Sequence, residues 1–465
     1  MNISAFPPNP EPRPGSQPGS QPGSQSGSRP APRRNGVGRL RRGGIALAVV
    51  PLLALTACSG SDGGGSDSEG DGPVELVFRQ QDPANESTGV KEMVKLWNKN
   101  HPDIQVTLQK ASWEDARAQF TREAQAQEGP DVLQVGFVWT SSLAEAGLLA
   151  PLDEYVKKNP PGQGIDDFIG TDLATVDDSL YALPWTVDTG TIVYRPDVFK
   201  EAGVKMDTTD WASFQKSVAQ VSKQSQGDVS GYCFNAANAW FQWNAYIWSN
   251  GDTFVKMEDG KPVPGMTKQE LAESIKYFNG FFDSGATPKS NAAVLEYGSP
   301  VLLGGLQRGD CAASFLPIAP YRSLLSENPD LKMRSAPMPA GEAGMASFLG
   351  GRALAVSAAS EHPEAAYKFA KWMTNKKLFQ ELGYPWWPAQ DSKIEAMKFS
   401  PAEQGYKEVL PNARTFAEYV KTGIPVDGVS ENLNQELSGV FSDRATPEQA
   451  AENILRILEE AIADV

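Results

Sequence analysis

The chain has 465 residues, more than one hydrophobic core accommodates, so two domains or two lobes are expected. Hydrophobic residues make up 40% of it and charged residues 21%, which is ordinary for a soluble globular protein. The formal net charge is −15, yet the first 57 residues contain seven Arg and one acidic residue, Glu11. The remainder is therefore strongly acidic, which argues against nucleic-acid binding, because such binding needs basic patches.

The N-terminal 57 residues have the pattern of a disordered leader followed by a signal peptide. Residues 1–32 are rich in Pro, Gly, Ser and Gln, a composition that buries no core. An Arg-rich patch follows, and then an apolar run over residues 45–57 that is too short to span a bilayer. Arg41-Arg42 also fits a twin-arginine signal, so the export route stays open.

The apolar run ends Leu55-Thr56-Ala57-Cys58, which resembles the bacterial lipobox. That resemblance implies cleavage before Cys58 and a lipid anchor on its sulfur, and two acyl chains hold a protein stably on a membrane. The alternative is a plain secretory signal followed by a chance Cys. Residues 58–72 contain little besides Gly, Ser, Asp and Glu, which predicts a flexible tether between the anchor and the folded protein.

The folded part begins with a β-α-β pattern, which predicts parallel strands. Apolar residues alternate over 74–78 and 104–108, and between them residues 90–97 carry an apolar helical face. A further apolar strand over 132–138 ends at Trp139. Because the carboxyl ends of parallel strands line the ligand crevice in open α/β sheets, Trp139 and the loop 80–86 are expected at one rim.

The segment 180–203 is expected to cross from one lobe to the other. Two strand-like runs, 180–185 and 191–194, are joined by small polar residues with no proper turn between them. This predicts that Trp185 and Asp188 lie in the crevice. The alternative is an edge hairpin beside a buried Trp.

The second half contains a return crossing and several further elements. Residues 348–356 predict the return, with two glycines that permit a close backbone approach. Strands are expected over 231–234 and 311–315, and an aromatic-rich helix over 240–248. The last helix has a complete capping signal, with Thr446 at the N-cap, a Pro at the first helical position and Gln449 closing the box.

Together these parts resemble the extracellular solute-binding lipoproteins of ABC importers, in the carbohydrate-binding branch (family 1) that includes maltose-binding protein. The resemblance covers 74–465, and it rests on short motifs that are weak singly and specific in this order behind a lipobox. They are Asp131-Val132, Trp139, Ala146-Gly147-Leu148, Pro151-Leu152-Asp153, Tyr181-Ala182-Leu183-Pro184-Trp185, Tyr194-Arg195-Pro196-Asp197, Ala202-Gly203, Gly350-Gly351, His362-Pro363-Glu364-Ala365-Ala366 and Gly383-Tyr384-Pro385.

The resemblance implies an α/β fold of two lobes joined by crossover strands, with the ligand held in the cleft between them. Carried onto this chain, lobe one spans 74–187 with 349–404, and lobe two spans 188–348 with 405–465. It also implies a monomer on the extracytoplasmic face of the cell membrane, with a sugar as ligand and ABC permease subunits and a separate ATPase as partners. Consistently, the chain has no GxxxxGK[ST] phosphate loop of its own.

A sugar offers an apolar face to aromatic rings and a rim of hydroxyls to amides, carboxylates and guanidinium groups. The candidates for ring stacking are Trp139, Trp185, Trp240, Trp243, Tyr321 and Trp386. The candidates for the hydroxyls are Gln80, Glu86, Asp188, Asn235 and Arg352, with Gly350 and Gly351 beside them. A single Trp is more often a core residue than a ligand contact, and Arg352 can equally form a structural ion pair.

Cys233 and Cys311 lie on apolar stretches of an exported protein, so a disulfide is expected, with two buried free thiols as the alternative. No cofactor and no metal site are expected, because the chain has only two His and no Cys/His cluster. Two other functions stay open. One is a secreted carbohydrate-active enzyme, although no nucleophile motif or His-based triad is present. The other is a peptide or polyamine binder on the same two-lobed plan.

Overall fold

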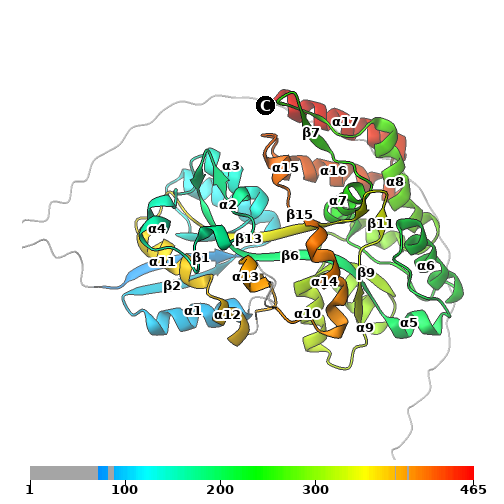
Figure 1. The fold of residues 1–465 in the computed structure, drawn as a ribbon, viewed down its shortest axis with the longest axis horizontal. Coiled ribbons are helices and arrows are strands. Elements are labelled where there is room, and N and C mark those ends of the chain that lie inside the picture. The colour runs from blue at the N-terminus through cyan, green and yellow to red at the C-terminus, as the bar shows by residue number, and fades with distance from the viewer. Residues whose placement is uncertain (1–71, 82–87, 383, 395–396) are drawn as a thin grey trace, which may run out of the picture. The chain divides into compact units, whose positions relative to one another are not determined.

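The computed structural model describes residues 72–81, 88–382, 384–394 and 397–465 (Figure 1). Glu69–Val465 pack as one unit. The expected leader and signal segment (1–57), the lipidation site Cys58 and all of the expected tether except Gly72 lie outside the described residues. The candidate Glu86 lies outside them as well.

The first part of the chain forms the predicted β-α-β arrangement. Strand β1 (Val74–Gln80) pairs in parallel with β2 (Ile104–Lys110) on one side and with β3 (Val132–Gly136) on the other. Helices α1 (Thr88–Asn100) and α2 (Trp113–Gln125) connect them. The parallel pairing brings the carboxyl ends of β1, β2 and β3 to one edge, as the sequence predicts.

Two long strands run across the molecule and carry the chain between its two halves (Figure 1). Strand β6 (Ala182–Tyr194) pairs antiparallel with β13 (Ser347–Val356), and Asp188 faces Gly350 in the register. Both expected crossings are therefore confirmed. The two runs expected in 180–194 form one continuous strand, and the edge-hairpin alternative is wrong, because β6 has partners along both sides.

These strands belong to a nine-stranded mixed sheet with the order β10-β6-β13-β3-β1-β2, which confirms the α/β fold class. Three short strands join β6 and one joins β13. They are β10 (Arg334–Ala336), β9 (Ala313–Pro317) and β14 (Trp387–Pro388) on β6, and β15 (Ala413–Arg414) on β13.

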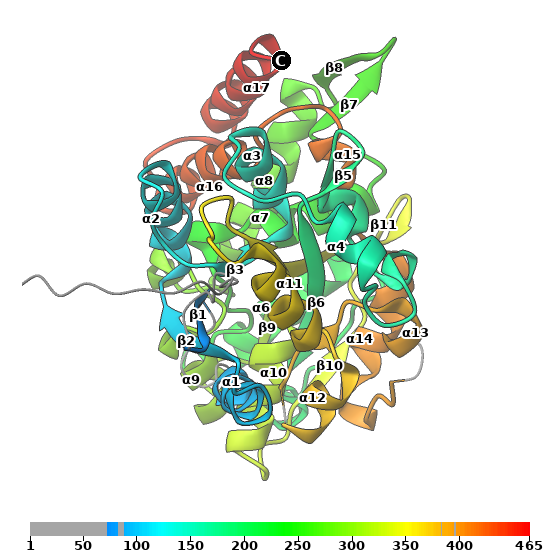
Figure 2. The same ribbon diagram turned by 90° about the vertical axis from the view of Figure 1, so that its left-hand side faces the viewer.

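The buried apolar residues form two hydrophobic clusters. The first surrounds β1, β2 and β3, where α1 buries Val90, Met93, Val94 and Trp97 on the face that its spacing predicts. Figure 2 shows α1 and α11 (Pro363–Met373) on this side. Residues from 294–333 also join the first cluster, so the two cores do not divide at the expected lobe boundaries, which remain a prediction.

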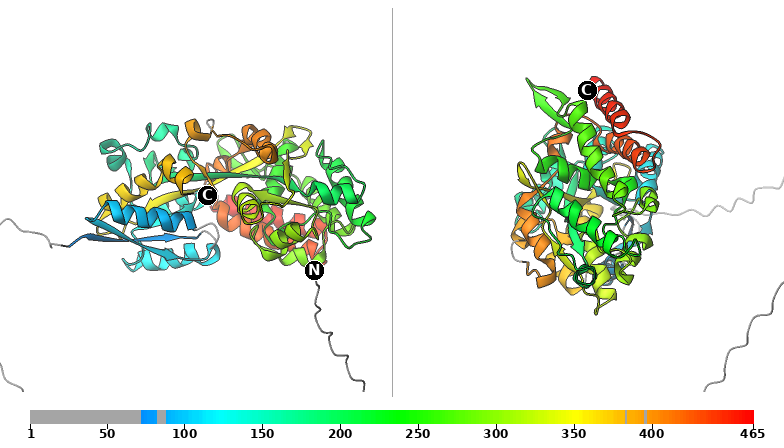
Figure 3. Two further views of the ribbon diagram at one scale, coloured as in Figure 1. Left: turned by 90° about the horizontal axis from the view of Figure 1, so that it is seen from below. Right: turned by 90° about the vertical axis from the view of Figure 1, so that its right-hand side faces the viewer.

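The second cluster is built by helices from the middle and the end of the chain. Helix α7 (Trp240–Ser249) lies at its centre, and α16 (Val426–Phe441) and α17 (Pro447–Ala463) pack with α8 (Lys268–Asp283) (Figure 3). The predicted capping box of α17 is present, since Thr446 Oγ1 accepts from the Gln449 N–H and Gln449 Oε1 accepts from the Thr446 N–H.

The remaining elements complete the two halves. The further strands are β4 (Thr175–Val176), β5 (Ser179–Leu180), β7 (Val255–Glu258), β8 (Lys261–Pro264), β11 (Ala340–Gly341) and β12 (Gly344–Met345). The further α-helices are α3 (Thr140–Glu145), α4 (Asp153–Lys158), α5 (Pro196–Glu201), α6 (Trp211–Gln224), α9 (Pro300–Arg308), α10 (Ile318–Glu327), α12 (Lys376–Glu381), α13 (Asp391–Ile394), α14 (Gln404–Val409) and α15 (Ala417–Val420). The 3-10 turns are η1 (Phe137–Trp139), η2 (Ile165–Asp167), η3 (Thr171–Leu173), η4 (Ala236–Asn238), η5 (Lys289–Ala293), η6 (Pro401–Glu403) and η7 (Leu410–Asn412).

A disulfide joins Cys233 to Cys311, which confirms the expected bridge over the free-thiol alternative. The segment 231–234 does not form the expected strand. It makes one isolated bridge, which pairs Cys233 with Ser314 of β9. The disulfide joins positions 78 residues apart in the sequence. It ties this irregular segment to Cys311, which lies just before β9.

Candidate functional site

A cavity of about 1340 Å³ is lined by side chains from both hydrophobic clusters. Phe137 and Trp386 belong to the first cluster, and Trp240 and Phe416 belong to the second. Small-molecule pockets usually measure ~300–1,000 Å³. The cavity therefore has room for a ligand of more than one ring.

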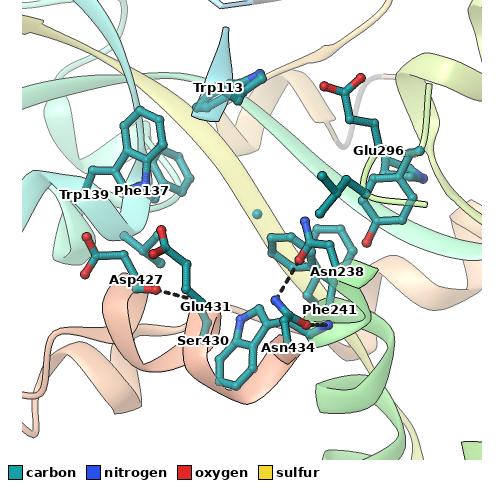
Figure 4. Close-up of a pocket in the computed structure, with 18 of the residues that line it drawn as sticks. Trp113, Phe137, Trp139, Asn238, Phe241, Glu296, Asp427, Ser430, Glu431 and Asn434 are labelled. Atoms are coloured by element: carbon teal, nitrogen blue, oxygen red, sulfur yellow. Dashed lines mark hydrogen bonds between the residues drawn. The ribbon is translucent and has the colours of Figure 1, made fainter. Parts of the chain in front are cut away.

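One wall is aromatic and comes from the carboxyl ends of the parallel strands. Trp113 opens α2 directly after β2, with Ser112 as its N-cap, and Trp139 ends η1 directly after β3. The two indole rings meet edge to face with centroids 5.0 Å apart, and both are half-buried. Gly136 lies beside both rings. This wall offers ring faces and edges to the cavity (Figure 4).

The floor is the pair of crossing strands, where Asp188 of β6 and residues 349–352 of β13 line the cavity. A Cβ atom added at Gly351 would lie 2.3 Å from a Phe137 ring carbon and 2.4 Å from the Thr186 carbonyl oxygen. Real Cβ atoms essentially never come so close. The glycine is thus required by the approach of β13 to β6 and to η1.

Arg352 follows the two glycines and lies flat among aromatic rings. Its guanidinium carbon is 3.3 Å from the centroid of the Trp386 ring and 5.4 Å from that of Trp113. Arg352 is 9% exposed and Trp386 is 4% exposed. A buried guanidinium stacked in this way is held in one plane, so its N–H groups point in fixed directions.

The opposite wall comes from the start of α7 and from α16. Asn434 of α16 accepts the Trp240 backbone N–H through Oδ1 at 3.0 Å and donates through Nδ2 to Asn238 Oδ1 at 3.0 Å (Figure 4). Phe241 packs on Phe348 with ring centroids 4.7 Å apart. The hydrogen bonds fix amide groups beside aromatic rings, which is the pairing of surfaces that a polyhydroxylated ring requires.

Three acidic residues of α16, Asp427, Glu431 and Glu436, and one from a loop, Glu296, line the cavity. Figure 4 shows Asp427 and Glu431 on the α16 side and Glu296 on the other. Asp427 forms an ion pair with Arg117 of α2, and Glu431 Oε1 lies 4.0 Å from Arg117 Nη2. Ionised carboxylates are hydrogen-bond acceptors, which suits them to receive hydroxyl donors of a ligand in the cavity.

Tyr297 adds a neutral hydroxyl to the same wall. Burial raises its pKa far above the ordinary value for a phenol, and the Asp188 carboxylate acts in the same direction. The phenol therefore stays protonated at neutral pH and keeps its O–H as a donor.

Seven of the candidates from the sequence line this cavity. They are Trp139, Asp188, Trp240, Gly350, Gly351, Arg352 and Trp386. They come from five separate stretches of the chain, which the crossing strands and the packing of the two cores bring together. Their role as ligand contacts stays a prediction.

Five other candidates lie in the cores and are not among the described residues that line the cavity: Gln80, Trp185, Asn235, Trp243 and Tyr321. The expectation that Trp185 lies in the crevice is wrong, because its side chain points into the first core. Its Nε1 donates to the Met373 carbonyl at 3.0 Å. Likewise Trp243 Nε1 donates to Ser274 Oγ at 3.1 Å, and the Tyr321 hydroxyl donates to the Ala402 carbonyl at 2.8 Å.

Sequence reasoning missed several lining residues. Trp113 follows β2 as Trp139 follows β3, so the strand-end rule that selected Trp139 also applies to it. Asp427, Glu431 and Phe241 had no such signal. Helical periodicity identifies which face of a helix is apolar, but not what its polar face lies against.

Among the residues that the structure describes, no group of three or more acidic, His or Cys side chains has the spacing of a metal site. No helix within the described ranges is long and apolar enough to cross a bilayer.

The chain resembles known proteins over most of its length. The family model of the bacterial extracellular solute-binding proteins matches residues 83–378. The galactooligosaccharide-binding protein of Bacillus subtilis is 25% identical over 336 residues, which cover 71% of this chain and 76% of that protein. The arabinooligosaccharide-binding protein of the same organism is 25% identical over 427 residues, 85% and 88% of the two chains.

A solved structure supports the same architecture. The GacH receptor of Streptomyces glaucescens, which was solved unliganded and with acarbose, superposes with a TM-score of 0.73 at 20% identity. The match covers 84% of this chain and 99% of that receptor. The fold is therefore the two-lobed fold of periplasmic binding proteins.

Proposed function

The chain belongs to the family of bacterial extracellular solute-binding proteins, and we propose that it captures a sugar of at least two rings in the cavity between its cores. The lobes close on the sugar and deliver it to the permease of an ABC importer, whose separate ATPase supplies the energy. The protein itself acts as a monomer and carries out no reaction.

The observation that carries this proposal is the composition of the cavity wall. Half-buried indole rings at Trp113 and Trp139 face a set of carboxylates and hydrogen-bonded amides on α16. Flat rings suit the apolar faces of a sugar, and fixed acceptors and donors suit its hydroxyls. A peptide or polyamine would use the carboxylates but leave most of the aromatic surface without a partner.

The architecture suits capture by hinge closure. Among the described residues, β6 and β13 are the longest strands and run between the two halves, so bending there moves one half against the other. We assign 74–187 with 349–404 to lobe one and 188–348 with 405–465 to lobe two. A ligand that contacts both lobes shifts the population toward the closed form.

We also propose that a lipid on Cys58 holds the protein at the extracytoplasmic face of the cell membrane. The Gly- and Ser-rich stretch 58–72 separates that anchor from β1, which begins at Val74. A tether of this composition lets the folded part reach a permease in the same membrane.

The test is a fluorescence titration of the unit from Glu69 onward with sugars, including acarbose, a galactotriose and an arabinotriose. A saturable change with one sugar, and unchanged sugar on chromatography afterwards, is the expected result. Trp139→Ala should weaken binding about tenfold, which corresponds to ~1.4 kcal/mol. Trp372→Ala is the matched control, because Trp372 is also a half-buried Trp packed on the first cluster, but it meets Trp97 edge to face and is not among the described residues that line the cavity.

Each other outcome points to a different function. Conversion of a sugar in this assay would identify an enzyme. If no sugar changes the fluorescence but peptides or polyamines do, the protein is a binder of those solutes on the same fold.

A further inference from the structure

Arg117 joins two helices that belong to different hydrophobic cores. It lies in the middle of α2, and its guanidinium pairs with the carboxylate of Asp427 in the first turn of α16. Its second terminal nitrogen lies 4.0 Å from Glu431, one helical turn further along α16. The ion pair therefore joins α2 to α16 through Asp427, which lines the cavity.

The two helices are anchored independently. Helix α2 buries Phe120 and Ala124 in the first cluster, whereas α16 buries Val429 and Leu433 in the second. Helix α16 also approaches η1, which carries Trp139. A contact between α2 and α16 thus depends on how the two halves are placed, and it is lost when they move apart.

This pair is more buried than an ordinary surface ion pair, so removing one partner leaves a buried charge without compensation. The Asp427 side chain is 6% exposed, the Arg117 side chain 34% and the Glu431 side chain 71%. A buried carboxylate needs a cation or several donors, and Arg117 supplies the cation. Asp427 also lies at the amino end of α16, where the helix dipole favours a negative charge.

Asp427 lines the cavity, whereas Arg117 is not among the described lining residues. Arg117 therefore influences a ligand through the carboxylate that it holds and through the lobe arrangement that it stabilises. It does so without a contact of its own in the described site.

We propose that Arg117 is a positioning residue for ligand capture. It fixes the Asp427 carboxylate at the cavity wall and links the two lobes across the cleft, so that part of the ordering needed for capture is complete before the sugar arrives. This rests on the proposed function for its ligand, although the link between the lobes exists without a sugar. The apparent dissociation constant is the intrinsic constant divided by the fraction of molecules in the binding-competent arrangement. Stabilising that arrangement therefore lowers the apparent dissociation constant.

The first test compares Arg117→Ala with Arg122→Ala in the unit from Glu69 onward. Arg122 is an exposed Arg in the last turn of the same helix and serves as the matched control. With the sugar that binds tightest in the panel above, Arg117→Ala should raise the dissociation constant about fivefold or more. Arg117→Lys should give a smaller loss, because it keeps the charge but not the fork. Equal affinity of Arg117→Ala and the control would overturn the proposal.

A double-variant cycle separates positioning from a general structural effect. If Arg117 acts through Asp427, then Arg117→Ala should weaken sugar binding much less in the Asp427→Asn protein than in the wild type. Fully additive losses would contradict the proposal. The salt dependence of binding should also be weaker in Arg117→Ala than in Arg122→Ala, since the bridging pair is partly exposed to screening.

A measurement without sugar keeps this inference separate from the proposed function. In the ligand-free protein, hydrogen exchange at the first turn of α16 and the radius of gyration should both increase in Arg117→Ala and stay unchanged in Arg122→Ala. If neither changes, Arg117 does not link the lobes, whatever the protein binds. If the hydrogen exchange and the radius of gyration both change but no sugar of the panel binds, Arg117 links the lobes and the proposed ligand class is wrong.

Discussion

Asp188 on β6 faces Gly350 on β13, and a Cβ atom at Gly350 would lie 2.9 Å from the Asp188 carboxylate oxygen. The same Cβ would lie 2.9 Å from the Phe348 ring. The missing side chain thus leaves room for the carboxylate exactly where the two crossing strands pass the cavity. This relationship ties the hinge strands to the candidate site.

The first prediction is that Gly351→Ala destabilises the protein by about 1–3 kcal/mol, because a Cβ there overlaps the backbone oxygen of Thr186 as well as Phe137. Gly350→Ala should destabilise the protein less than Gly351→Ala does. It should weaken sugar binding more, since the added Cβ displaces the side chain of Asp188. Denaturant unfolding and sugar titration measure the two effects. Gly428→Ala in α16 is the control, because its Cβ meets no described atom within 4 Å. A stable Gly351→Ala protein would contradict the close approach of β13.

The second prediction concerns Arg352 and its stacking on Trp386. Arg352→Lys keeps the charge but loses the planar stack at 3.3 Å, so sugar affinity should fall by about fivefold, near the ~1 kcal/mol of a partly buried cation–π contact. Arg414→Lys is the control, because Arg414 also stacks on a Trp, at 5.2 Å from Trp248, but is more exposed. Equal affinities of the two variants in calorimetric titration would remove Arg352 from the site.

The third prediction is a pH dependence of stability at Glu403. Burial opposes its ionisation, but Arg322 and the Ser400 N–H outweigh burial and hold the pKa of Glu403 below its ordinary value. A depressed folded pKa stabilises the protein above the unfolded pKa, ~4.3, and that contribution disappears as the pH falls through the folded value. The wild type should therefore exceed Glu403→Gln in free energy of unfolding at pH 7, and the gap should close in acid. Glu459→Gln, at an exposed site of α17, is the control for a Glu→Gln change outside such an ion pair.

The fourth prediction concerns the Cys233–Cys311 bridge, which closes a loop of 78 residues. Replacing both Cys by Ser should lower the free energy of unfolding by about 2–5 kcal/mol, as for other native disulfides of exported proteins. The unit from Glu69 has no other Cys, so thiol labelling under denaturing, unreduced conditions is unambiguous. Two labelled thiols per chain would show that the bridge is absent.

The sequence predicts those parts of the fold that depend on local chemistry. The β-α-β start follows from the spacing of apolar residues, and the last helix follows from the capping pair Thr446 and Gln449. The two crossings were predictable because the small polar residues between the runs 180–185 and 191–194 make no proper turn, and because 348–356 is mostly apolar around its two glycines. The bridge was predictable from the export context of two Cys.

The site was less predictable, because facing the cavity is a tertiary property. Trp139 and Trp185 each stand at the end of an apolar run in the sequence, yet only Trp139 lines the cavity, while Trp185 is buried in the first core. Adjacent Trp386 and Trp387 are both buried, but only Trp386 borders the cavity. The α16 carboxylates lie more than 200 residues from the crossing strand β6 in sequence, and nothing local to them indicates what they face.

The most direct test of sugar capture between the lobes is hydrogen-exchange mass spectrometry of the unit from Glu69, with and without the sugar that binds tightest. If the sugar is captured in the cavity, it should protect both walls at once: η1 with the start of α2 on one lobe, and the first turns of α7 and α16 on the other. Protection confined to one lobe, or protection elsewhere on the surface, would contradict capture in this cavity.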